Sequence, residues 1–508
     1  MTGISRRDFL KVATCLPVVA AARKLSGASQ RGPNADLPNI IVLVFDAWSA
    51  AHLPLYGYAR QTMPNLEQFA ERAVVFHRHY SVGTFTVPGT ATLLTGLHPW
   101  SHRALALGGE IASEHRDHHI FSLLGPSCNT LGFAQNEYAD LVLSQAAGYL
   151  DAYLPSDSFS LQHNLLYTLP IFQNDLGAAH ATFENDIFQR GLEADASLFV
   201  GPLRRLLRWR STRALDAEYR MTYPRGLPVT LDQFRLEDVV EGAIRILGSL
   251  PRPSLAYLHF YPPHGFYRPK GKFSRSFMDG LEPPLKPVHA LSTENPGSDA
   301  ETSQRLRYDQ YMASWDAELG RLFEYLRTSG LLDTSYVFIT SDHGEMFERG
   351  VIGHYTPLIY DPLVRVPLIV SRPGRTDRID VRVPTSNVDL LPTIASLTGI
   401  ESPSWAEGRL LPEFGGTPDP DRSIYIVDAK TNAAAAKLTR VSLSLTKNDY
   451  RLTYYQYPEL DYARFELYQL PDDPDELHDL YSEVSPVGSR LKDELLQTLR
   501  DVNREVER

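Results

Sequence analysis

The sequence predicts an α/β protein with a mostly parallel central sheet, helices on both faces of that sheet, and a small C-terminal subdomain built on an antiparallel sheet. Two apolar, β-branched runs, Asn39–Phe45 and Tyr336–Thr340, are typical of strands buried on both faces. An amphipathic helix at 236–247 precedes a further strand at 255–260, which is the alternation expected of parallel units. The 508 residues, 43% of them hydrophobic and 22% charged, are sufficient for a large globular core.

The first 28 residues have the features of a twin-arginine export signal. Arg6 and Arg7 precede a short apolar stretch, residues 12–22, and small residues follow near Gly27. An ordinary basic tail is the alternative interpretation. The apolar stretch is too short to cross a bilayer, so we expect no transmembrane anchor. The export signal predicts a periplasmic or secreted protein and a passage through the twin-arginine export machinery.

Charge and cysteine content exclude several classes of function. Lys and Arg number 50 against 61 Asp and Glu, which gives a net charge of -11. No long run of like charge is present, so nucleic acid is not expected as a partner. Cys15 and Cys128 are the only cysteines, too few for a disulfide framework or a thiolate zinc site. Any metal must therefore be held by oxygen and nitrogen ligands.

We expect a catalytic domain at residues 36–400, interrupted by an insertion at about 150–235. The insertion contains an arginine cluster that is interpreted as a solvated helix face or, alternatively, as a contact for an anionic surface; its members are Arg204, Arg205, Arg208 and Arg210. An amphipathic helix is predicted at 306–329, after a surface loop or lid rich in Pro, Ser and acidic residues at 281–303.

The C-terminal subdomain is expected at residues 401–508. Short runs with alternating polarity predict antiparallel strands at 423–427, 441–445 and 451–455, and a final helix at 491–502.

Two predicted strands end in residues that suit a ligand site. Asp46 follows the first, and Asp342 and His343 follow the second. A single Asp after a strand is commonly a cap or a turn former. Ligands in open α/β sheets bind beyond the carboxyl ends of strands, so two such ends together predict a shared site.

A third segment surrounds Thr86. Pro88 favours the first turn of a helix, residues 91–94 continue it and Gly96 ends it, which places Thr86 just ahead of the helix N-terminus. Free N–H groups and the helix dipole attract an anionic ester to such an end. The alternative is that Thr86 is only an N-cap.

Together these segments resemble the sulfatase family of the alkaline phosphatase superfamily. The resemblance covers roughly residues 38–480 and includes Asp46, the Thr86-x-Pro88 turn, the run Thr340–Glu345 and the run Arg365–Val370. It implies an alkaline phosphatase/sulfatase-like fold and an enzyme that acts on phosphoric or sulfuric esters.

The departures from the usual sulfatase pattern concern the nucleophile. Thr86 stands where most sulfatases carry the Cys or Ser that is converted to formylglycine, Thr90 replaces their Arg, and Ala47 replaces their second Asp. The remaining set resembles the single-metal site of phosphoethanolamine and glycerophosphate transferases in the same superfamily, whose nucleophile is threonine.

This resemblance implies one divalent cation held by four residues: Asp46, Thr86, Asp342 and His343. Carboxylate, hydroxyl and imidazole ligands suit Mn, Zn or Mg, with Ca less favoured because of the imidazole. A cation is also the means by which an alcohol becomes an effective nucleophile.

Two histidines are candidates for the substrate side. His264 resembles the family position that contacts the anionic ester and is a candidate proton donor to the leaving group. His354, in a loop before a strand expected at 363–370, stands where many sulfatases carry a lysine. Each has the alternative of being a loop histidine satisfied by backbone groups. His259 is expected to be structural, and no second metal is expected.

The sequence therefore predicts an exported, metal-dependent hydrolase of phosphate mono- or diesters with Thr86 as nucleophile. Its expected substrate is an anionic ester, either a small molecule or a glycan or lipid headgroup. Three alternatives remain open: a sulfatase that uses unmodified Thr86, a phosphoglycerol- or phosphoethanolamine-type transferase, and a non-catalytic anion-binding homologue.

Overall fold

The computed structural model describes residues 37–160, 234–482 and 485–506, and the isolated positions 206, 209 and 213. The predicted export signal at 1–28 lies outside the described residues. So does most of the insertion at 150–235, including its four arginines.

The core of the molecule is an eight-stranded sheet. In spatial order its strands are β11 (Ile379–Val381), β2 (Ala73–Phe76), β10 (Leu368–Ser371), β7 (Ser335–Thr340), β1 (Asn39–Phe45), β6 (Ser254–Phe260), β4 (Asn129–Ala134) and β5 (Ala152–Leu154). β10 runs antiparallel to both of its neighbours, and the other pairings are parallel. The predicted mostly parallel sheet is therefore confirmed.

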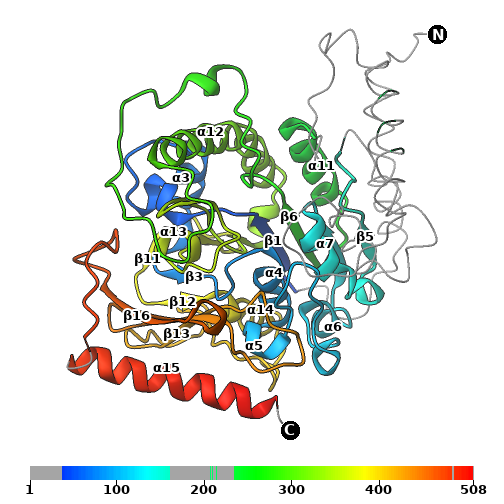
Figure 1. Cartoon of the computed structure of the whole chain (residues 1–508). Helices are drawn as coiled ribbons and strands as arrows, with labels where there is room; N and C mark the ends of the chain where they lie inside the picture. Colours follow the sequence, from blue (N-terminus) through cyan, green and yellow to red (C-terminus); the bar gives the residue numbers. More distant parts are fainter. Residues whose placement is uncertain are drawn as a thin grey trace, which may run out of the picture.

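Helices cover both faces of this sheet (Figure 1). On one face, α3 (Pro64–Ala70), α11 (Leu236–Gly248) and α12 (Ser298–Thr328) pack on Ile41, Leu43 and Phe45 of β1. The other face carries α4 (Thr86–Thr95), α6 (Ile120–Leu124), α7 (Glu137–Ser144) and α14 (Leu390–Leu397), which pack on Ile40, Val42 and Val44. Successive side chains of a strand point to opposite faces, so one continuous apolar run supplies two cores.

Two sequence predictions need correction. The helix expected at 306–329 begins at Ser298, inside the predicted loop, because Asp299 and Glu301 in its first turn interact favourably with the helix dipole. The strand expected at 363–370 is α13 (Asp361–Val364) followed by β10. Pro362 favours the start of a helix, and Pro367 has no N–H to donate to a sheet.

The C-terminal subdomain is an antiparallel sheet with strands β13 (Ile424–Asp428), β14 (Val441–Lys447), β15 (Tyr450–Tyr457) and β16 (Tyr462–Gln469). Helix α15 (Pro486–Glu505) lies along this sheet (Figure 1) and buries Leu491, Leu495 and Leu499 against it. Three of these strands were predicted from the sequence, whereas β16, with Ala463 and Arg464 exposed in its N-terminal half, was not.

Shorter elements connect these layers: α5 (Pro99–His102) and the two-stranded pairs β3 (His79–Tyr80) with β12 (Thr385–Ser386) and β8 (Met346–Glu348) with β9 (Val351–Gly353). Within the described ranges, none of the helices combines the length and the apolar character that crossing a membrane requires.

Candidate metal centre and active site

Four adjacent strands of the central sheet, β7, β1, β6 and β4, carry polar residues to the same edge. Asp46 follows β1, Asp342 and His343 follow β7, His259 is the second-to-last residue of β6, and Asn136 lies just beyond β4. The parallel direction of these strands places their carboxyl ends side by side.

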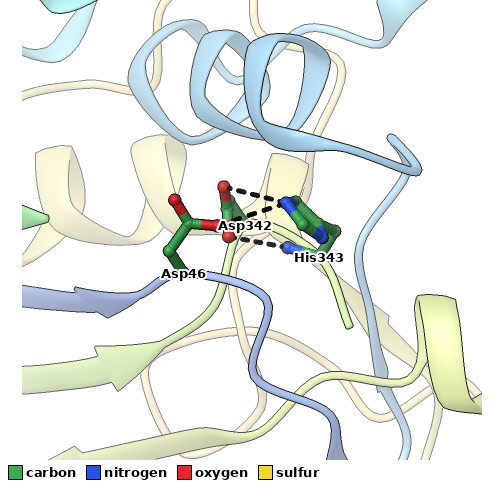
Figure 2. Close-up of side chains that lie close together, drawn as sticks. All are labelled: Asp46, Asp342 and His343. Atoms are coloured by element: carbon green, nitrogen blue, oxygen red, sulfur yellow. Dashed lines mark hydrogen bonds and ion pairs between the residues drawn. The ribbon is translucent and has the colours of Figure 1, made fainter. Parts of the chain in front are cut away.

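Asp46, Asp342 and His343 form a compact, fully buried cluster (Figure 2). His343 Nε2 lies 3.3 Å from Asp46 Oδ1 and 3.5 Å from Asp342 Oδ2. Each residue offers one ligand atom within 4.8 Å of the others. The structure thus brings together three of the four predicted metal ligands.

Thr86, the fourth predicted ligand, lies beside this cluster. Its Oγ1 atom is 3.2 Å from His343 Nε2. Thr86 is the first residue of α4 and Phe85 is the N-cap, so the helix begins one residue earlier than predicted. Pro88 is tolerated in the first turn because N–H groups there have no intrahelical partner.

Close packing fixes α4 against the loop that carries the metal ligands. A Cβ atom on Gly89 would lie 2.3 Å from the carbonyl oxygen of Asp342. Any side chain at this position would push the start of α4, and with it Thr86, away from the cluster. Glycine is therefore needed for the close approach of Thr86 to this cluster.

The chain itself partners one oxygen of each carboxylate. The Asn136 side-chain amide donates to Asp46 Oδ2 over 2.5 Å, and the backbone N–H of His343 donates to Asp342 Oδ1 over 3.0 Å. Asp46 Oδ1 and Asp342 Oδ2 are buried and have no hydrogen-bond partner among the described residues. A divalent cation would satisfy both oxygens, so the residues present fit the expected metal.

The orientation of His343 also suits a metal ligand. Its Nδ1 atom lies 2.9 Å from the carbonyl oxygen of Gly344, to which Nδ1–H donates. Nε2 then faces Asp46, Asp342 and Thr86, where a bound cation would displace its proton. Burial lowers the pKa of His343, but the Asp342 and Asp46 carboxylates outweigh this effect and raise the pKa to about 9. The electrostatic potential at Nε2 therefore favours a positive charge there.

The two carboxylates differ in their electrostatic environment. Burial raises the pKa of Asp342, and the neighbouring Asp46 carboxylate raises it further. Burial also acts to raise the pKa of Asp46, but His264, His259 and His343 together hold it well below its usual range. Two neighbouring carboxylates of like charge favour a cation between them.

A cavity of about 230 Å³ opens beside Thr86. Its lining includes both predicted substrate-side histidines, His264 and His354. The remaining walls are mainly aromatic and apolar, with Phe85, Tyr138, Tyr261, Tyr355 and Leu107, and also include Asn136 and Glu137. The cavity is where an ester would contact the Thr86 hydroxyl.

His264 and His354 lie against each other in the lining of the cavity. Their ring centroids are 4.8 Å apart, and the ring of His354 is 4.3 Å from that of His343. His354 Nδ1 lies 2.9 Å from Glu345 Oε1, and the Tyr267 hydroxyl donates to Glu345 Oε2. Burial lowers the pKa of His354 to about 4, despite the opposing effect of Glu345, so this ring is neutral at pH 7.

Sequence reasoning missed three residues of this site: Asn136, His259 and Glu345. His259 was expected to be structural, yet its Nε2 atom faces both Asp46 and Asp342. The available signal was its place near the carboxyl end of a buried strand, the same signal that identified Asp46. Asn136 follows a strand end in the same way and Glu345 closes the Thr340–Glu345 run, but their contacts with Asp46 and His354 become visible only in the tertiary structure.

Comparisons with known proteins agree with this architecture. The sulfatase family model matches residues 38–130 and 208–400, and the model for the C-terminal part of N-sulphoglucosamine sulphohydrolase matches residues 353–504. The crystal structure of a phosphonate monoester hydrolase of Agrobacterium radiobacter superposes with a TM-score of 0.65 and 18% identity, covering 92% of this chain and 96% of the other. At that identity the superposition establishes the fold.

Two curated relatives also align with the chain. An ulvan-active sulfatase of Formosa agariphila is 23% identical over 388 residues, which cover 76% of this chain and 66% of the relative. An N-acetylglucosamine-6-O-sulfatase of Bacteroides thetaiotaomicron is 27% identical over 212 residues, 39% of this chain and 37% of the relative. The chain thus matches just under two thirds of the first relative's length and a smaller part of the second.

Proposed function

The chain belongs to the sulfatase family, and from this premise we propose that it is an exported, metal-dependent hydrolase of phosphate mono- or diesters with Thr86 as its nucleophile. The observation that carries the proposal is the position of Thr86 Oγ1, 3.2 Å from His343 Nε2 at the mouth of a cavity. The proposed catalytic unit is residues 36–400, with the C-terminal subdomain at 401–508.

The proposed cation ligands are Asp46, Thr86, Asp342 and His343. When bound, a divalent cation supplies Lewis-acid stabilisation of negative charge on the attacking and ester oxygens. Mn, Zn or Mg suits this mixture of oxygen and imidazole ligands better than Ca does.

The chain's own residues carry out the remaining steps. Thr86 Oγ1 releases its proton to solvent and attacks phosphorus, the ester P–O bond breaks, and the alcohol departs, which leaves a phosphoryl group on Thr86. The proposed role of His264 is to protonate the departing oxygen, and that of His354 is to contact the anionic ester. Water then attacks the same phosphorus, which releases phosphate or a phosphate monoester and restores the Thr86 hydroxyl.

The first test compares rates on an aryl phosphate monoester, an aryl phosphate diester and an aryl sulfate in buffers supplemented with Zn²⁺ or Mn²⁺. We expect a phosphate ester to be turned over fastest. Thr86→Ala is expected to lose at least about 1,000-fold in kcat/KM, and Thr86→Ser, which keeps a hydroxyl, to lose less. A phosphoryl group found on Thr86 by mass spectrometry after rapid quenching would support the covalent step.

A second candidate is sulfate ester hydrolysis by unmodified Thr86, favoured by the names of both curated relatives. Faster turnover of the aryl sulfate would replace the phosphoryl proposal with this one. Product carrying an added alcohol would indicate a transferase. Retained anion binding without turnover of any ester would indicate a binding homologue.

Export is tested separately by cell fractionation. We expect the protein to leave the cytoplasm by the twin-arginine route and to remain there when Arg6 and Arg7 are both replaced by Lys. The substrate in its native setting is proposed to be an anionic ester of a small molecule, a glycan or a lipid headgroup.

A further inference from the structure

We propose that His259 is an additional nitrogen ligand of the cation, which makes the centre a site with two carboxylates and two imidazoles. This inference rests on the proposed metal dependence. It adds a residue from β6, so that three adjacent strands, β7, β1 and β6, each supply at least one ligand.

The distances fit ligands of one ion better than they fit hydrogen bonds. His259 Nε2 lies 3.6 Å from Asp342 Oδ2, which has no hydrogen-bond partner among the described residues, and 3.7 Å from Asp46 Oδ2, the oxygen to which Asn136 donates. Hydrogen bonds from N–H to oxygen are commonly about 2.7–3.2 Å long, and a separation of about 3.6 Å is too long for one. Atoms that coordinate one ion at Zn–N and Zn–O bond lengths in a tetrahedral arrangement lie about 3.3–3.6 Å apart. His343 Nε2 has the same spacing, at 3.3 and 3.5 Å from the carboxylates.

Three buried polar atoms converge at this place without partners. His259 Nε2, Asp46 Oδ1 and Asp342 Oδ2 make no hydrogen bond to any described residue. All three side chains are fully buried. A buried polar atom without a partner is costly, and two such atoms only 3.6 Å apart, His259 Nε2 and Asp342 Oδ2, indicate a missing common partner.

The other nitrogen of the His259 ring is held in a way that suits metal binding. Nδ1 lies 3.3 Å from the hydroxyl oxygen of Tyr257, which is two residues earlier and on the same side of β6. Donation from Nδ1–H to this oxygen leaves the lone pair of Nε2 directed at the two carboxylates. Such an outer partner is the usual way in which a ligand histidine is oriented.

A second imidazole also determines which ions the site prefers. Calcium and magnesium favour all-oxygen surroundings, whereas zinc and manganese accept nitrogen ligands. With His259 and His343 both as ligands, the centre selects a transition-metal ion over calcium and magnesium.

Metal titration of metal-free protein tests the inference without reference to catalysis. We expect His259→Ala to weaken Zn²⁺ binding by at least about 100-fold, the upper end of the loss caused by removing an outer-shell partner. His259→Gln keeps a neutral oxygen that can coordinate the ion. Its Zn²⁺ affinity is therefore expected to lie between those of the native and His259→Ala proteins. The matched control is His102→Gln, because His102 is equally buried but bonds to Thr92, away from the cluster.

A second measurement uses the unaltered protein, so a folding defect in a variant does not decide the outcome. Pulsed electron paramagnetic resonance of the Mn²⁺-loaded protein counts coordinated nitrogens, and we expect two in the native chain and one in His259→Ala. One coordinated nitrogen in the native chain, or equal Zn²⁺ affinity in native and His259→Ala proteins, would overturn the inference.

The number of ions bound per chain distinguishes one shared centre from the alternative arrangements. One ion per native chain supports a shared centre. Two ions that fall to one in His259→Ala would overturn it in favour of two ions bridged by Asp46. Failure of the native chain to bind any divalent cation would instead refute the proposed metal dependence itself.

Discussion

The buried charges at the edge of the central sheet and those at the junction with the C-terminal subdomain differ in where their partners come from. At the junction, Arg451 is fully buried and bonds to Asp361 over 3.1 Å and to Glu476 over 2.8 Å. Arg365 Nε donates to the second oxygen of Asp361, and the Asp361 backbone N–H donates to the second oxygen of Glu476. Every carboxylate oxygen of this junction cluster has a partner within the chain.

In the metal centre, by contrast, Asp46 Oδ1 and Asp342 Oδ2 have no partner among the described residues. The nearest nitrogen atoms are those of the His259 and His343 imidazoles, 3.3–3.7 Å away, rather than guanidinium groups in direct contact. Buried charge by itself therefore does not mark a functional site. A buried charged group that lacks partners within the described part of the chain is the more informative signal.

The largest expected effect is that of Asp342→Asn, which tests this contrast at the metal centre. Loss of a ligand carboxylate is expected to lower kcat/KM by at least about 1,000-fold in excess metal. In metal-free protein the same change removes repulsion with Asp46, so the urea midpoint should rise. The control is Asp361→Asn, which should lower the urea midpoint, because it weakens the pairs with Arg451 and Arg365. A metal-free Asp342→Asn protein less stable than the native chain would contradict the contrast.

Arg451→Met is expected to have the next largest effect, this time on stability. It leaves Asp361 and Glu476 buried without their guanidinium partner, which should cost about 3–5 kcal/mol of unfolding free energy. Arg464→Met, at the exposed pair with Asp479, is the control and should cost no more than about 1 kcal/mol. Equal losses for the two variants, measured by urea unfolding, would show that the junction cluster is not held as the geometry indicates.

The pH dependence of stability provides a third comparison. It concerns His102, a buried histidine whose neutral ring has hydrogen-bond partners within the chain. Burial lowers the pKa of His102 to about 3, and its nitrogens bond to Thr92 Oγ1 and to the N–H of Ala104. The unfolded chain, with a histidine pKa near 6.5, binds more protons between pH 6.5 and pH 3, so stability falls as the pH drops through this window.

From pH 7 to pH 5 this group alone should cost about 2 kcal/mol. His102→Gln removes the titration and should reduce the loss, as measured by urea unfolding at the two pH values. An unchanged loss in the variant would assign the acid sensitivity to other groups, such as His79 and His119, whose pKa values burial also lowers to about 4.

The smallest expected effect concerns Lys430, which connects the two regions. Its Nζ atom pairs with Asp428 at 2.6 Å, donates to the Thr356 carbonyl oxygen, and lies 4.8 and 5.5 Å from the rings of Tyr355 and Phe85. Both rings line the cavity beside Thr86. Lys430→Met should loosen this wall and lower kcat/KM by about 10-fold, mainly through KM, because the lost contact orients the cavity rather than the reacting atoms. A fall in kcat alone would contradict this role.

Much of the fold was predictable because strands and helices follow from patterns among residues that are close in the sequence. The runs at Asn39–Phe45 and Ser254–Phe260 are buried over their whole length and mostly apolar, because parallel strands are covered on both faces. Predictions were less accurate where local signals compete. The start of α12 and the division between α13 and β10 depended on caps and prolines that the apolar pattern did not weigh.

The sequence by itself determined that Asp46, Asp342 and His343 end two buried strands and that Thr86 stands at a helix N-terminus, because strand ends and helix starts follow from local residue types. Only the tertiary structure decided that β6 lies next to β1, which directs His259 at the carboxylates, and that Asn136 and Glu345 support their neighbours. These contacts join residues from 9 to more than 200 positions apart, and packing of the whole chain, rather than any local pattern, brings them together.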